Sequence, residues 1–63
     1  MEVNNMVAYI VKKIKDAKDK QGLAAAQAIY RQLFITKDTY DDIKEFVDLD
    51  LITAGYGDCI VTE

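Results

Sequence analysis

The residues with the greatest potential for chemistry are carboxylates, and they are concentrated between positions 38 and 50. This segment contains six acidic residues and a single lysine. Carboxylates can hold a divalent cation, but an EF-hand loop requires acids at its first, third and fifth positions and glycine at its sixth. Counting from Asp38 places Tyr40 at the third position, and counting from Asp48 places Ile52 at the fifth. The spacing therefore predicts no metal site, and we expect no cofactor.

Nucleophilic and acid–base catalysis also have little support in the sequence. The chain lacks histidine, the side chain that most often acts as a base near neutral pH. Its one cysteine, Cys59, has no imidazole partner, and we interpret it as a small buried hydrophobe. Gly55 and Gly57 lie outside the strand–loop–helix context of a phosphate loop and predict only a turn. We therefore expect no catalytic residues and no enzymatic activity.

Charge is distributed unevenly along the chain. Residues 1–31 contain six Lys or Arg and three acids, whereas residues 32–63 contain two Lys or Arg and eight acids. Such polarity can steer a partner or favour contact between copies, the alternative being two solvated helix faces. Five lysines between positions 12 and 20 are interrupted by Asp16 and Asp19, and the chain has a single arginine. Because DNA-binding helices usually have a larger basic excess, we do not expect a nucleic-acid partner.

Seven residues are candidates for contact with another protein. Four are acids of the segment described above, which would suit a basic protein surface. One is a tyrosine outside the main apolar stripe of the first helix, where an aromatic residue either anchors an interface or forms a half-buried rim. Two are apolar residues near the C-terminus. The candidates are Tyr9, Asp38, Asp41, Asp42, Glu45, Ile60 and Val61.

Length and composition indicate one small domain, residues 1–63, that needs support beyond its own core. A chain this short buries only about 60% of its unfolded surface. A single cysteine allows no internal disulfide, so regular helices and self-association remain as sources of stability. The longest apolar run near the N-terminus, residues 6–11, is too short to span a bilayer. We expect a soluble cytoplasmic protein without a membrane partner.

A helix hairpin is predicted for the first half of the chain. Apolar residues recur at steps of four and three along residues 3–17, with Asn4 and Asn5 as candidate N-caps and Gly22 as a left-handed C-cap. An alanine-rich segment, residues 23–34, follows almost at once, which favours a tight antiparallel pair. The stripe of the first helix comprises Val3, Val7, Ile10, Ile14 and Ala17, widened by Met6 and Val11.

The central helix should bury an alanine-rich face against the first helix, and Tyr30 should lie in the core. A third helix should follow, with Thr36 as its N-cap and an apolar stripe facing the same core. The alanines are Ala24, Ala25, Ala26 and Ala28, and the stripe of the third helix comprises Tyr40, Ile43, Phe46 and Val47.

Two structures are open for the C-terminal residues. The apolar runs 51–53 and 59–62 flank a glycine-containing turn, a pattern typical of a small β-hairpin. Alternatively the third helix continues to Thr53 and an extended tail follows. If the tail forms a strand, its apolar residues Ile60 and Val61 could pair with a strand of another molecule.

The segment from Phe34 to Ile43, Phe-Ile-Thr-Lys-Asp-Thr-Tyr-Asp-Asp-Ile, resembles an element of short XkdX-like proteins encoded in phage and prophage tail regions. That element has the pattern aromatic-Ile-Thr-(acidic or Lys)-x-x-Tyr-x-x-Ile, and Thr-Gly usually follows it. This chain continues with Lys44 and Glu45 instead. The resemblance implies a phage accessory or virion component, located in the host cytoplasm or the virion, and it implies no catalytic residues.

Together these patterns predict an all-α fold: a helix hairpin plus a third helix, with a short irregular or β C-terminal tail. The function expected is that of a non-enzymatic protein–protein interaction module that associates with itself. A first alternative is a small acidic inhibitor that occupies a basic, nucleic-acid-binding surface of another protein. A second alternative is a small DNA-binding regulator that uses its first helix.

Overall fold

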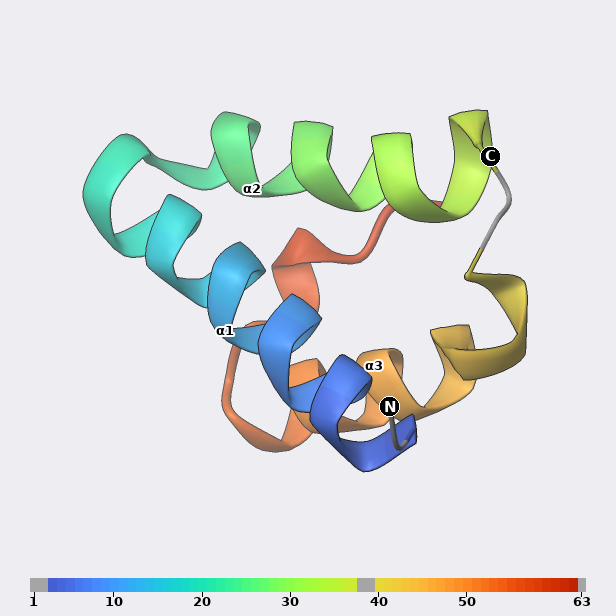
Figure 1. Ribbon diagram of the computed structural model, residues 1–63. Helices are drawn as coiled ribbons and strands as arrows, with labels where there is room; N and C mark the ends of the chain where they lie inside the picture. Colours follow the sequence, from blue (N-terminus) through green and yellow to red (C-terminus); the bar gives the residue numbers. More distant parts are fainter. Residues whose placement is uncertain (1–2, 38–39, 63) are drawn as a thin grey trace.

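The computed structural model describes residues 3–37 and 40–62, and it confirms the all-α three-helix fold (Figure 1). These residues contain no β-strand. No helix among them combines the length and the apolar character needed to cross a membrane. The elements are α1 (Val3–Gln21), α2 (Leu23–Arg31) with a π-helical turn (Gln32–Thr36), α3 (Asp41–Thr53) and a 3₁₀ turn (Gly57–Cys59).

The predicted antiparallel hairpin of α1 and α2 is confirmed, and Gly22 makes the turn between them (Figure 1). Gly22 has φ 101° and ψ 171°, a backbone region that is essentially restricted to glycine and differs from the left-handed cap that we expected. Its N–H donates to the carbonyl of Lys18 at 3.0 Å and so closes the end of α1. The predicted caps Asn4 and Asn5 are wrong, because α1 begins at Val3 and includes both.

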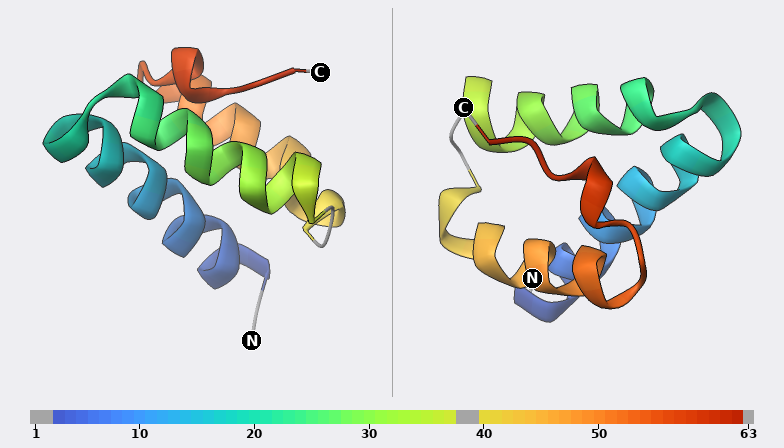
Figure 2. Two further views of the ribbon diagram at one scale, coloured as in Figure 1. Left: turned by 90° about the horizontal axis from the view of Figure 1, so that it is seen from above. Right: turned by 180° about the vertical axis from the view of Figure 1, so that it is seen from behind.

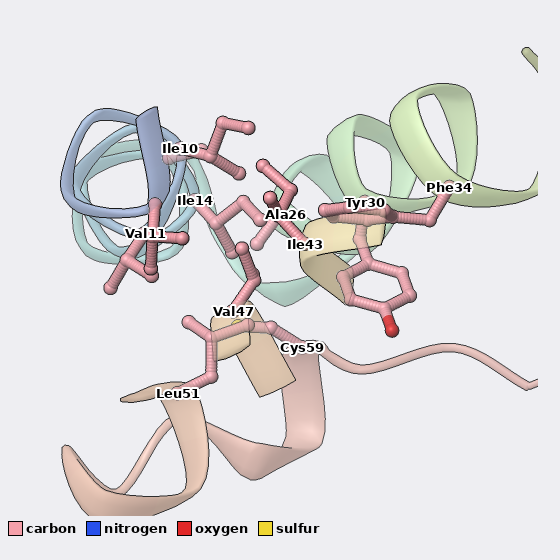
Figure 3. Close-up of a cluster of buried hydrophobic side chains, with 12 residues drawn as sticks. Ile10, Val11, Ile14, Ala26, Tyr30, Phe34, Ile43, Val47, Leu51 and Cys59 are labelled. Carbon is pink, nitrogen blue, oxygen red and sulfur yellow. The ribbon is translucent and has the colours of Figure 1, made fainter. Parts of the chain in front are cut away.

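The first apolar stripe is buried as expected from Val7 to Ala17, and it forms the centre of the core (Figure 3). Met6 is half-buried against this core, and the predicted burial of Val3 falls on a side chain outside the described part of the structure. Ile14 is fully buried on α1, and Tyr30 of α2 is fully buried opposite it. The rings of Tyr30 and Phe34 lie 4.8 Å apart between centroids, an aromatic pair that closes one end of the cluster. The buried residues of α1 are Val7, Ile10, Val11, Ile14 and Ala17.

The alanine-rich face of α2 is only partly as predicted. Ala26 is fully buried, Ala25 is half-buried, and both Ala24 and Ala28 are exposed. Successive helix residues are rotated by about 100°, so alanines at adjacent positions point in different directions and cannot share one face.

The helical path continues past Phe34, where we expected it to end. The N–H of Lys37 donates to the carbonyl of Gln32 at 3.2 Å, the five-residue spacing of a π-turn. Thr36 therefore lies inside this turn, and its prediction as an N-cap is wrong. Tyr40 occupies the N-cap position of α3 without a side-chain cap hydrogen bond.

The buried stripe of α3 differs from the prediction at one important residue. Ile43, Val47 and Leu51, each four positions from the next, are buried on one line. Phe46, predicted to belong to this stripe, is 54% exposed because it is rotated by about 100° from Val47. The side chain of Tyr40 is half-buried against the core.

The C-terminal hairpin prediction is wrong, and the alternative in which α3 continues to Thr53 is confirmed. Gly55 turns the chain with φ 84°, and the following segment runs across the molecule beside α2 (Figure 2, right). Cys59 is fully buried, as expected, and Ile60 and Val61 are half-buried against the same core. The described part of this segment thus packs on its own helices.

Candidate interaction surfaces

The outward side of α3 has an unusual concentration of exposed apolar side chains. Leu49 is 61% exposed, Ile52 60% and Phe46 54%. In the part of the chain that the structure describes, only two other large hydrophobic residues are exposed, and they lie on other helices. Single exposed apolar residues are common on protein surfaces, whereas a group of them on one helix is a candidate binding surface.

Carboxylates precede these apolar side chains along the same helix. Asp41, Asp42 and Glu45 are exposed on the first half of α3, and a shallow open depression runs from Asp41 along the helix to Ile52. The fourth predicted acid, Asp38, lies outside the described residues. We define the α3 outer face as Asp41, Asp42, Glu45, Phe46, Leu49 and Ile52.

A hydrogen-bonded network fixes one side of this face to the core. The hydroxyl of Tyr30 donates to Asp48 Oδ1 at 2.6 Å, and Lys44 Nζ donates to Asp48 Oδ2 at 3.2 Å. Burial, reinforced by the hydrogen bond to Asp48, raises the pKa of Tyr30 to about 12. Hydrogen bonds to Tyr30 and Asp48 raise the pKa of Lys44. Lys44 and Asp48 therefore have partners within the molecule, and their charges largely offset one another.

Removing the Tyr30 hydroxyl should destabilise the protein in a pH-dependent way. The native pKa of about 12 exceeds the ordinary value of 10.0, so the hydroxyl contributes fully below pH 10 and loses its contribution as pH rises through 12. We expect Tyr30→Phe to cost about 1 kcal/mol at pH 7 and progressively less above pH 10. Urea unfolding at pH 7 to 11.5 measures this, with Tyr9→Phe as the exposed control. An equal cost at every pH would contradict the assignment.

A second outward surface, on α1, has the opposite charge. Tyr9 is 63% exposed, outside the buried stripe as its position predicts, and Lys13 Nζ lies 5.9 Å from the centroid of its ring. Lys12 and Lys13 are exposed beside it, and the half-buried Asp16 is the one carboxylate lining the same shallow depression. We define the α1 outer face as Tyr9, Lys12, Lys13 and Asp16.

The C-terminal segment is held by polar contacts that the sequence analysis missed. Lys18 Nζ donates to both carboxylate oxygens of Asp58, at 2.8 and 3.0 Å, and this contact lowers the pKa of Asp58. Gln27 Nε2 donates to the backbone carbonyl of Asp58 at 2.9 Å. The hydroxyl of Tyr56 lies 2.8 Å from an oxygen of Asp19, to which it donates, and this raises the Tyr56 pKa. The pairs are 31 to 40 residues apart, so no periodic pattern predicts them.

Two of the predicted partner-binding residues, Ile60 and Val61, contact their own core in this arrangement. The thiol of Cys59 lies beside them, and burial raises its pKa, which makes it a poor nucleophile. Within residues 3–37 and 40–62, no three acidic or cysteine side chains are grouped closely enough to hold a metal ion.

The described residues thus place two outward helix faces of opposite charge on one small helical domain. The sequence did not predict that three apolar side chains of α3 would be exposed: Phe46, Leu49 and Ile52. They lie on the same helix face as the predicted acids. No family model, no curated protein and no solved structure matches the chain.

Proposed function

We propose that this chain is a non-enzymatic protein–protein interaction module, that it associates with itself, and that the α3 outer face is its binding surface. The observation that supports the proposal is the exposure of Phe46, Leu49 and Ile52 together on one helix. Removing apolar surface from water is favourable by about 25 cal/mol per Å². A partner that covers these side chains therefore gains free energy that the isolated chain leaves unused.

The small size of the chain gives self-association a further advantage. A 63-residue chain has limited capacity to bury apolar area within itself. Its α3 holds two apolar sets, the buried line of Ile43, Val47 and Leu51 and the exposed set on the outer face. A second copy of the chain would cover the exposed set, just as α1 covers the buried set.

Sedimentation equilibrium across a wide concentration range tests the proposal. The average mass of the unmodified chain should rise above the monomer value of 7.1 kDa as concentration increases. The double variant Leu49→Gln with Ile52→Gln should weaken association at least tenfold while keeping its helical circular dichroism, because both side chains are exposed. Leu23→Gln, at an exposed leucine on α2, is the matched control and should associate like the unmodified chain.

Two outcomes would contradict the proposal. A mass of 7.1 kDa at every concentration would exclude self-association and favour the acidic-inhibitor alternative. Association that persists unchanged in the double variant would place the contact elsewhere on the molecule.

A further inference from the structure

The α1 outer face and the α3 outer face are positioned to be used at the same time by two neighbours. The helices α1 and α3 pack directly against each other, and both contribute their buried stripes to the shared core. Each helix turns its buried stripe inward, so each outer face points away from the shared core. A contact made by one face therefore leaves the other accessible.

The two faces are complementary in charge. The exposed charges of the α3 outer face are all negative: Asp41, Asp42 and Glu45. Lys12 and Lys13 are the exposed charges of the α1 outer face. Opposite charges on two docking faces speed the encounter and fix the register of the contact.

The order of residues along the two helices also matches. On α3 the acids come first and the apolar residues Leu49 and Ile52 follow, whereas on α1 Tyr9 comes first and the lysines follow. If the helices dock antiparallel, Tyr9 lies against Leu49 and Ile52, and the two lysines lie against Glu45 and Asp42. Aromatic–aliphatic contact then occupies one end of the interface and ion pairing the other.

Symmetric pairing of two α3 outer faces is less favourable. Paired in parallel, the two faces would bring their exposed carboxylates together; paired antiparallel, they would place the acids of each copy against Leu49 and Ile52 of the other. The one lysine of α3, Lys44, is already bound to Asp48 at 3.2 Å. Like charges brought together across an interface oppose association. An isologous contact would therefore bury apolar area against a larger electrostatic penalty than the contact with α1, where two lysines lie beside the single carboxylate of Asp16.

We propose that the α3 outer face of one copy docks antiparallel on the α1 outer face of a second copy, a head-to-tail contact. This inference rests on the proposed self-association and specifies its geometry. Because a head-to-tail contact leaves one free face at each end, the chain assembles into rings or open filaments rather than stopping at a dimer.

Mixing two one-sided variants tests the geometry. The first variant, Lys12→Glu with Lys13→Glu, has a reversed α1 outer face. The second, Leu49→Gln with Ile52→Gln, has a disabled α3 outer face. Each alone should remain at the monomer mass of 7.1 kDa, whereas an equimolar mixture should form a species of twice that mass and nothing larger. In the mixture, the intact α3 outer face of the first variant can dock on the intact α1 outer face of the second variant. The two remaining faces are disabled, so the complex cannot grow further.

The failure of this inference is distinguishable from the failure of self-association itself. If the unmodified chain stays monomeric, the proposed function is wrong. If the unmodified chain associates but the first variant associates equally well, and the mixture forms no heterodimer, the contact is isologous and the head-to-tail geometry is wrong.

A further variant gives an effect of the opposite sign. Asp16 lies on the α1 outer face and would approach the acids of α3, so Asp16→Asn should strengthen association several-fold. Raising the salt concentration from 50 to 500 mM should weaken association of the unmodified chain, because exposed charges are screened over about 10 Å at 0.1 M. Weaker association of Asp16→Asn, or association independent of salt, would overturn the charge pairing.

Discussion

A chain that ends at Gly57 is expected to lose about 3–5 kcal/mol of its free energy of unfolding, which is a large share of the total for so short a chain. The residues removed include the fully buried Cys59 and the half-buried Ile60 and Val61. Their loss exposes apolar surface on α2 and α3 and leaves a hole where the Cys59 side chain lay. A chain of this length has only about 3–9 kcal/mol of stability at roughly 0.05–0.15 kcal/mol per residue.

Urea unfolding followed by circular dichroism measures this loss, and two controls identify its source. A chain lacking only Glu63 should unfold like the full chain. Asp58→Asn removes the ion pair with Lys18 but keeps the apolar packing. It should have a small effect, because Asp58 is exposed and Lys18 is only half-buried, so solvent screens the pair. A chain ending at Gly57 that unfolds at the same urea concentration as the full chain would contradict a structural role for the segment.

The first helix could be predicted from sequence because its apolar residues define a single line. Ile10, Ile14 and Ala17 recur at steps of four and three, and no large aliphatic side chain competes for the opposite side. Helix period and hydrophobic burial then specify one orientation. The exposure of Tyr9 follows from the same pattern, because it lies off that line.

The orientation of α3 could not be predicted because its apolar residues surround the helix. A stripe through Phe46 and a stripe through Leu51 are both compatible with the helix period. The choice between them depends on where α1 and the C-terminal segment lie, and that is tertiary information. The same ambiguity concealed the exposure of Leu49 and Ile52. The one sign of it in the sequence is that α3 has more apolar residues than a single buried stripe can contain.

The acids of the candidate site were predictable in part. Charged side chains are rarely buried, so the exposure of Asp41, Asp42 and Glu45 follows from their type. Asp48, by contrast, binds Tyr30 and Lys44. Its contact with Tyr30 depends on how α2 packs against α3, and no periodic pattern in the sequence predicts it.

Replacing Ala26 by leucine is expected to lower the free energy of unfolding by about 3 kcal/mol, the upper end for overpacked core positions. Ala26 is fully buried, and its methyl group points toward Ile10 and Ile14 of α1 (Figure 3). Protein interiors are packed as densely as organic crystals, so a leucine at this position has no free volume to occupy. It must either push α1 away from α2 or adopt a strained rotamer, and both lower stability.

The helix itself supplies the matched control. Ala28→Leu makes the same substitution at an exposed position of α2, so intrinsic helix preference changes equally and only the packing differs. We expect Ala28→Leu to alter the free energy of unfolding by less than about 0.5 kcal/mol, and the half-buried Ala25→Leu to fall between the two. Thermal and urea unfolding of the three variants give the comparison. If Ala26→Leu were as stable as Ala28→Leu, the contact between α1 and α2 would have to be loose enough to admit a larger side chain, contrary to the close packing around Ala26.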